Sequence, residues 1–150
     1  MNEVHFSSKT NEWATPMDLF RVLDRRCHFT LDPCSTKRNA KCKKFFTWKE
    51  NGLRQSWAGE TVFMNPPYGR EIGHWIRKAY EESTQGATVV CLIPARTDTA
   101  YWHDYVMRFA DEIWLKRGRI KFGGSQNSAP FPSAVIVFRP HSHRLVMRAF

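Results

Sequence analysis

The chain has 150 residues, of which 42% are hydrophobic and 14% aromatic, and its 23 Lys and Arg against 14 Asp and Glu give a net charge of +9. This length provides for one domain with a single core, and a chain so rich in apolar and aromatic residues is not intrinsically disordered. No apolar run reaches the ~18 residues that span a bilayer, and the polar N-terminus lacks the apolar stretch of a signal peptide.

We therefore expect one cytoplasmic domain over residues 1–150, with its core over 12–138 and a basic tail over 139–150. Lys and Arg gather in clusters, among them 37–44 and 116–121, and this excess of cations suits a polyanionic partner such as nucleic acid. The histidines show no metal-ligand spacing and no cysteine lies in a C-x-x-C pair, so we expect no metal site and buried or idle thiols at Cys27, Cys34, Cys42 and Cys91.

The first predicted helix begins next to Thr15, a residue type that caps helix N-termini. Pro16 suits the first helical position, and Asp18 follows three residues after the cap. Leu19 and Leu23 then lie on one apolar face of this helix.

Short apolar runs and helical periodicity alternate along the rest of the chain. Helices are predicted over 72–80 and 101–109, and strands over 29–31, 45–48, 61–64, 88–93, 112–115 (or on to 122) and 134–138. This alternation predicts an α/β sheet with helices on both faces, in which ligands bind outside the carboxyl ends of the strands. Asp32 and Asn65 each follow one of these strands and are candidate site residues.

The tetrapeptide Asn65-Pro66-Pro67-Tyr68 follows an apolar strand and precedes an amphipathic helix. An aromatic amine such as adenine N6 is a poor nucleophile, because its lone pair is delocalised into the ring. The Asn65 side-chain carbonyl and the Pro66 backbone carbonyl can accept its two hydrogens, and consecutive prolines hold these acceptors rigidly. Tyr68 offers a flat face for an extruded base. A simple strand-ending turn is the competing interpretation, and the position between strand and helix favours the catalytic one.

Several further motifs occur in a fixed order around this tetrapeptide. They are Trp13-x-Thr15-Pro16, Leu31-Asp32-Pro33-Cys34, Phe63-Met64 before Asn65, Leu92-Ile93-Pro94-Ala95 with Thr99 and Trp102, and Gly118-Arg119-Ile120-Lys121-Phe122. With these motifs in this order, the chain resembles the phage-type DNA N6-adenine methyltransferases, a small branch of the amino-methyltransferases. The resemblance covers residues 12–138 and implies a reduced Rossmann-like methyltransferase sheet, mostly parallel, with an antiparallel strand near the C-terminus.

The resemblance also implies S-adenosylmethionine as cofactor and DNA as substrate. Asp32 matches the acidic residue near the methionine end of the cofactor, where a carboxylate suits its ammonium. Trp13, Thr15 and Pro16 match a segment that holds the same moiety, next to Asn65.

Other candidates come from their positions in the chain. Glu50 follows the second strand and is a candidate for the ribose hydroxyls. Phe122 is a candidate second wall of a base-stacking pocket, and the neighbouring Arg119 and Lys121 are candidate DNA contacts.

The chain departs from larger relatives in two respects. The segment 32–44 contains no glycine, whereas those relatives carry a Gly-rich loop after the first strand. In addition, 150 residues leave no room for a separate target-recognition domain. We therefore expect relaxed or short-site specificity, from a monomer or a homodimer.

Three alternatives compete with this prediction, and the cytosine-C5 enzyme is rejected because of the position of its cysteine. The same tetrapeptide serves methyltransferases that act on RNA bases or on a glutamine side chain, although the net charge disfavours glutamine. A cytosine-C5 enzyme needs a nucleophilic cysteine, but Cys34 follows the first strand, at the cofactor position. A non-enzymatic DNA-binding protein derived from a methyltransferase also fits the charge.

Overall fold

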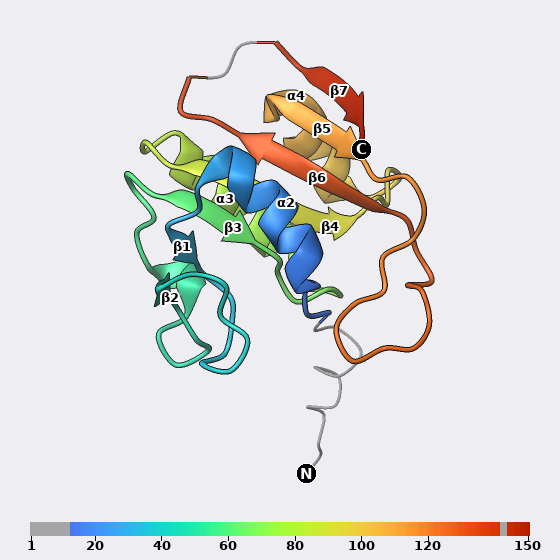
Figure 1. Cartoon of the computed structure of the whole chain (residues 1–150). Helices are drawn as coiled ribbons and strands as arrows, with labels where there is room; N and C mark the ends of the chain where they lie inside the picture. Colours follow the sequence, from blue (N-terminus) through green and yellow to red (C-terminus); the bar gives the residue numbers. More distant parts are fainter. Residues whose placement is uncertain (1–12, 142–143) are drawn as a thin grey trace.

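One mixed sheet of seven strands forms the centre of the part of the chain that the computed structural model describes, residues 13–141 and 144–150 (Figure 1). The strand order is β2-β1-β3-β4-β6-β5-β7. The strands are β1 Leu31–Asp32, β2 Lys44–Phe45, β3 Thr61–Met64, β4 Thr88–Pro94, β5 Glu112–Leu115, β6 Ser133–Phe138 and β7 Val146–Ala149.

The first four strands are parallel, as a β-α-β arrangement requires. β1 pairs in parallel with β2 and β3, and β3 pairs in parallel with β4. β6 runs antiparallel between β4 and β5, and β7 pairs in parallel with β5. The prediction of a mostly parallel sheet with an antiparallel strand near the C-terminus is therefore confirmed.

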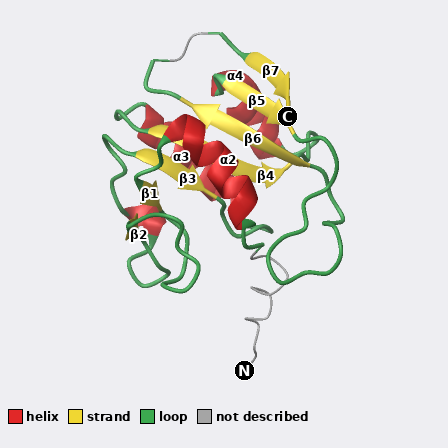
Figure 2. Ribbon diagram, viewed as in Figure 1, coloured by secondary structure: helices red, strands yellow, loops and turns green. Residues whose placement is uncertain are grey.

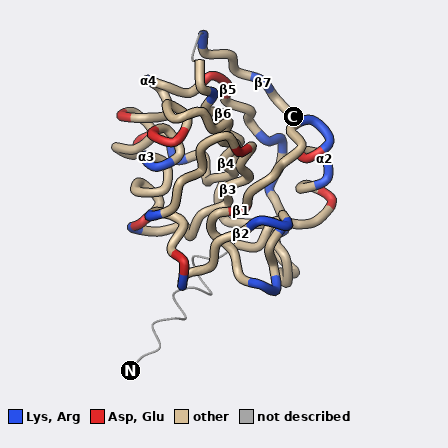
Figure 3. Tube along the Cα trace, turned by 90° about the vertical axis from the view of Figure 1, so that its left-hand side faces the viewer, with Lys and Arg blue, Asp and Glu red and all other residues tan. Residues whose placement is uncertain are grey.

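Helices cover both faces of the sheet, as the alternation predicted (Figures 1 and 3). Helix α2, Met17–Cys27, lies on one face, where Phe20 meets Phe63 of β3 with ring centroids 5.1 Å apart. Helix α3, Ile72–Ser83, lies on the opposite face together with the π-helical segment η2, Trp102–Val106, and the short α4, Met107–Phe109. Figure 2 shows the sheet between these helices.

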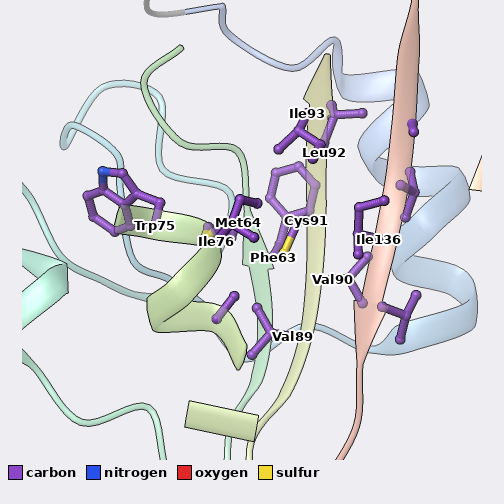
Figure 4. Close-up of a cluster of buried hydrophobic side chains, with 14 of the residues drawn as sticks. Phe63, Met64, Trp75, Ile76, Val89, Val90, Cys91, Leu92, Ile93 and Ile136 are labelled. Atoms are coloured by element: carbon purple, nitrogen blue, oxygen red, sulfur yellow. The ribbon is translucent and has the colours of Figure 1, made fainter. Parts of the chain in front are cut away.

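The core lies where β3 and β4 meet α3 (Figure 4). Every residue of β4 after Thr88 is buried, and so is every residue of β6. Such continuous apolar runs belong to strands that are covered on both faces. The rigid centre of the sheet fixes the positions of the loops that follow β1 and β3.

Some element boundaries differ from the predicted ones. β1 begins at Leu31 rather than at residue 29, and β2 ends at Phe45 because the chain turns at 47–50. β5 ends at Leu115, so the alternative prediction that this strand continues to residue 122 is wrong.

The predicted basic tail over 139–150 was partly wrong, because Val146–Ala149 form β7. All four residues of β7 are exposed, so its sequence has no buried face to show as a pattern. Its pairing with β5 is a contact between segments distant in the chain, which local sequence does not predict. In the described part of the chain, no helix has the length and apolar character of a membrane span.

Candidate active site

A cavity of about 290 Å³ lies at the carboxyl ends of β1 and β3. Four segments line it: Trp13 to Thr15, the loop after β1, the connection from β2 to β3, and the loop after β3 with the first turn of α3. This is the place where ligands bind in open α/β sheets. Asp32 and Asn65, predicted to share a site, both line this cavity.

The side chain of Asn65 is fixed by two hydrogen bonds. Its amide nitrogen Nδ2 donates to the Trp13 carbonyl at 2.5 Å and to the Thr15 hydroxyl at 2.8 Å. Because a carbonyl only accepts, the contact with Trp13 determines which end of the amide is the nitrogen. The other end, Oδ1, is buried and has no hydrogen-bond partner among the described residues. The fold thus holds a free acceptor in the cavity wall.

Thr15 has a different role from the predicted one. Helix α2 begins at Met17 with Pro16 at the N-cap position, and none of the side chains that the structure describes caps the helix. Thr15 is 5% exposed, and its hydroxyl binds Asn65 instead. The Trp13 carbonyl accepts one N–H of the Asn65 amide, and Thr15 accepts the other, which outweighs the benefit of a helix cap. Pro16 is the N-cap residue of α2 and is not among the residues that line the cavity.

Asp32 is 4% exposed and organises the loop that follows β1. One carboxylate oxygen accepts from the Cys34 N–H at 3.4 Å and the other from the Lys41 N–H at 3.0 Å. Burial raises the pKa of this carboxyl above its ordinary value of 3.8, and the two backbone N–H groups oppose that rise. Asp32 therefore holds the loop after β1 in shape and places a carboxylate at the cavity.

Gly52 is a site residue that the sequence analysis missed. It begins the short η1 segment, Gly52–Arg54, and a Cβ built at this position would lie 2.0 Å from the Pro33 carbonyl oxygen. Only glycine lets these two backbones approach so closely. The Asn51-Gly52 pair was the available signal, because Asn51 adopts a positive φ of 56° and its side chain accepts from the Leu53 N–H at 3.1 Å.

Glu50 is outside the residues that line the cavity. Its carboxylate accepts from the Thr47 N–H at 2.7 Å and the Thr47 hydroxyl at 2.9 Å, and these bonds lower its pKa. Thr47 and Glu50 therefore close a local turn, which occupies the Glu50 carboxylate. The structure gives the predicted ribose contact no support. The cavity rim here is formed instead by Trp48, which is 82% exposed, and by Asn51.

Tyr68 and Phe122 lie beside the cavity in an aromatic cluster with Trp13 and Phe131. The Tyr68 ring centroid is 6.1 Å from that of Phe122 and 5.6 Å from that of Phe131. Tyr68 is 3% exposed, and its hydroxyl donates to the Leu92 carbonyl at 3.1 Å. Burial raises the pKa of this hydroxyl well above its ordinary value, so it stays a neutral donor. The two rings are neighbours, as predicted, but neither presents a free face in this conformation.

Arg119 and Lys121 lie in the connection from β5 to β6. Arg119 donates to the Ala129 carbonyl at 3.3 Å, whereas Lys121 is exposed. The Gly123 N–H donates to the Ala14 carbonyl at 2.8 Å, so this connection is tied to the segment that fixes Asn65. Among the described residues, no group of three or more His, Cys, Asp or Glu side chains is arranged to hold a metal ion.

The sheet order and the cavity at its carboxyl edge define a small Rossmann-like α/β fold. The DNA N-6-adenine-methyltransferase (Dam) family model matches residues 5–147, and the chain belongs to that family. A DNA N-6-adenine-methyltransferase of Haemophilus phage HP1 is 31% identical over 136 residues, which are 85% of this chain and 78% of that protein. One of Escherichia phage T1 is 29% identical over 106 residues, which are 69% of this chain and 44% of that protein.

Two solved structures resemble the chain more distantly. A putative class I S-adenosylmethionine-dependent methyltransferase of Listeria monocytogenes has a TM-score of 0.45 and 11% identity, covering 70% of this chain and 41% of that one. A predicted O-methyltransferase of Agrobacterium tumefaciens has a TM-score of 0.43 and 19% identity, covering 90% of this chain and 64% of that one.

Proposed function

We propose that this protein transfers a methyl group from S-adenosylmethionine to the N6 amine of adenine in DNA. The observation that carries the proposal is the Asn65 amide, whose nitrogen is hydrogen-bonded while its buried oxygen has no partner among the described residues. Membership of the Dam family and the names of the two phage relatives support adenine in DNA as the target.

The amine of the target base is activated by the carbonyl groups of the Asn65-Pro66 segment. Asn65 Oδ1 accepts one amine hydrogen and the Pro66 backbone carbonyl accepts the other, and both residues line the cavity. These bonds draw the nitrogen toward a tetrahedral geometry, in which its lone pair is available for attack. Acceptors that are already in place need no reorganisation during the reaction. Neither residue forms a covalent bond with the base.

The cavity fits the cofactor in charge as well as in position. Asp32 is suited to the ammonium of the methionine moiety, and Trp13 and Thr15 line the same cavity beside Asn65. When bound, S-adenosylmethionine supplies a methyl group activated by its sulfonium. The role of this chain is to hold that group and the target amine next to each other and to exclude water.

We expect cofactor affinity to fall at acidic pH because of Asp32. Burial holds the folded-state pKa of Asp32 above 3.8, so the charged carboxylate lowers folding stability as pH rises from 3.8 through the folded-state value. An ammonium group bound beside the Asp32 carboxylate stabilises its charged form and offsets this loss of stability. Calorimetry with S-adenosylhomocysteine, which carries the same ammonium, should show weaker binding as pH falls through the pKa of Asp32 in the free protein. Asp32→Asn should bind weakly at neutral pH and lose this dependence, and an unchanged pH profile in that variant would exclude the role.

Thr15 acts on the reaction through Asn65. Thr15→Val keeps the shape of the side chain but removes the hydroxyl that binds Asn65 Nδ2. We expect kcat/KM for methyl transfer to fall about fivefold to tenfold, the effect of one lost hydrogen bond, while Thr15→Ser retains activity. Steady-state kinetics and thermal melts of both variants test this. A lower melting temperature in Thr15→Val without a change in kcat/KM would show that Thr15 is merely structural.

The target base needs a stacking surface, and the aromatic cluster beside Asn65 is the candidate. Because Tyr68 packs against Phe122 and Phe131, a base can stack on it only after one of these rings moves. The loop over 116–132 carries both of the latter rings, and we propose that it shifts when DNA binds. After this movement of the loop, Tyr68 and Phe122 would be able to stack on the target base.

The net charge of +9 supports a polyanionic substrate. Lys and Arg lie along α2 and near β2 (Figure 3). We propose that residues 1–150 act as one methyltransferase domain, and the phage relatives make the host cytoplasm the proposed compartment.

The proposal is tested by incubating the protein with S-adenosylmethionine and with DNA or RNA, followed by nucleoside mass spectrometry. We expect N6-methyladenine in DNA. Methylation of RNA alone would assign the enzyme to the other substrate, and DNA binding without cofactor binding would identify a non-enzymatic protein.

A further inference from the structure

The cavity wall contains a polar group that the proposed reaction does not use. Five buried side-chain polar atoms lack a hydrogen-bond partner in the described part of the chain, and three of them belong to residues that line this cavity: Ser35, Asn65 and Trp75. A buried polar atom without a partner is costly, so such a concentration points to a ligand. Asn65 is assigned to the target amine, which leaves the Ser35 hydroxyl and the indole N–H of Trp75 without an assigned ligand. The hydroxyl can donate or accept, whereas the indole can only donate and is therefore the more selective group.

Trp75 is held firmly in the first turns of α3. It is 6% exposed, and its ring stacks on that of Trp57 with centroids 6.4 Å apart. The equivalent N–H of Trp57 donates to the Gly52 carbonyl at 3.0 Å, so the fold satisfies one indole of this pair and not the other. Figure 4 shows Trp75 at the edge of the buried cluster, with its ring nitrogen on the side away from Met64 and β4.

Trp75 lines a different part of the cavity wall from the residues that hold Asn65. The transfer end is marked by Asn65 and its partners Trp13 and Thr15. Trp75 instead adjoins the connection from β2 to β3, because its ring atom Cη2 lies 3.2 Å from where a Cβ of Gly52 would be. If the sulfonium lies at the Asn65 end, the adenosine part of the cofactor extends toward Trp75.

We propose that the indole N–H of Trp75 donates a hydrogen bond to a ring nitrogen of the cofactor's adenine, and so helps the protein to select an adenosyl cofactor. This inference rests on the proposed function, since it takes S-adenosylmethionine as the ligand. The adenine ring is planar and carries acceptors at N1, N3 and N7, while the indole provides a donor only. A small movement of the wall brings the donor into contact, and the bond then satisfies a group that is otherwise buried alone.

The experiment is calorimetry with S-adenosylhomocysteine and its 1-deaza, 3-deaza and 7-deaza analogues, each of which lacks one ring acceptor. Trp75→Phe keeps the stacking on Trp57 and removes the donor, and we expect it to bind S-adenosylhomocysteine about tenfold more weakly than the wild type. One analogue should bind the wild type about tenfold more weakly than the parent, and the variant should bind that analogue and the parent equally well. Trp114→Phe is the control, because its indole donates to Glu112 on β5, far from the cavity, and its affinity should be unchanged.

Unchanged affinity of a folded Trp75→Phe overturns the inference, and so does a variant that still distinguishes the analogue from the parent. If the variant fails to fold, the wild-type series decides: equal affinity for all four ligands overturns the inference. If the wild-type protein does not bind S-adenosylhomocysteine at all, the proposed function itself is contradicted. Failure of the proposed function can therefore be distinguished from failure of the inference about Trp75.

Discussion

Asn65→Ala is expected to reduce the rate of methyl transfer by a factor of about 10²–10³, as the loss of one positioned hydrogen-bonding group does in other enzymes. The variant removes Oδ1, the acceptor proposed for the target amine, together with the amide nitrogen that binds Trp13 and Thr15. Cofactor affinity should change much less, because Asp32 and the other cavity residues remain. Single-turnover kinetics with radiolabelled S-adenosylmethionine, together with calorimetry, measure the two effects separately.

Gln85→Ala is the control, because Gln85 carries the same amide group, is exposed in the turn after α3 and lies outside the cavity lining. Its rate should equal that of the wild type. An Asn65→Ala enzyme that transfers methyl groups at the wild-type rate would exclude Asn65 from catalysis.

Gly52→Ala is expected to have the largest effect on stability and on the shape of the cavity. The added Cβ would overlap the Pro33 carbonyl oxygen, and the backbone on both sides leaves little room to move. Overpacking of this kind typically costs about 1–3 kcal/mol, and here the displaced Pro33 adjoins Asp32. We expect a loss of stability in that range in urea unfolding, and weaker binding of S-adenosylhomocysteine.

Gly73→Ala provides the comparison within the same chain. Gly73 lies inside α3, where a Cβ would make an ordinary contact at 3.7 Å with Tyr101, and alanine favours helices over glycine by about 1 kcal/mol. Gly73→Ala should therefore leave stability unchanged or raise it. If both variants unfold at the same urea concentration as the wild type, the close approach of Gly52 and Pro33 does not exist.

The sequence was sufficient for those parts of the structure that depend on local pattern. The continuous apolar run of β4 and the helical spacing from Ile72 to Tyr80 predicted their elements correctly, because burial on one or both faces leaves a period in the sequence. The positions of Asp32 and Asn65 at strand ends followed from the same alternation, since parallel strands bring their carboxyl ends to one edge.

The remaining features depend on contacts between distant segments or on competition between partners. Thr15 has the sequence of a helix cap, but a residue fifty positions away takes its hydroxyl. Gly52 meets Pro33 only once β1 and η1 are packed together. Tyr68 has the sequence position of a stacking residue, but its neighbours in space, Phe122 and Phe131, cover it.

The most direct test is a crystal structure of the protein with S-adenosylhomocysteine. The ligand should occupy the cavity between Asp32 and Trp75, with Asn65 Nδ2 still bound to Trp13 and Thr15 and Oδ1 facing the sulfur end of the ligand. A ligand bound elsewhere, or an Asn65 side chain turned so that its oxygen meets Thr15, would contradict the assignment of this site.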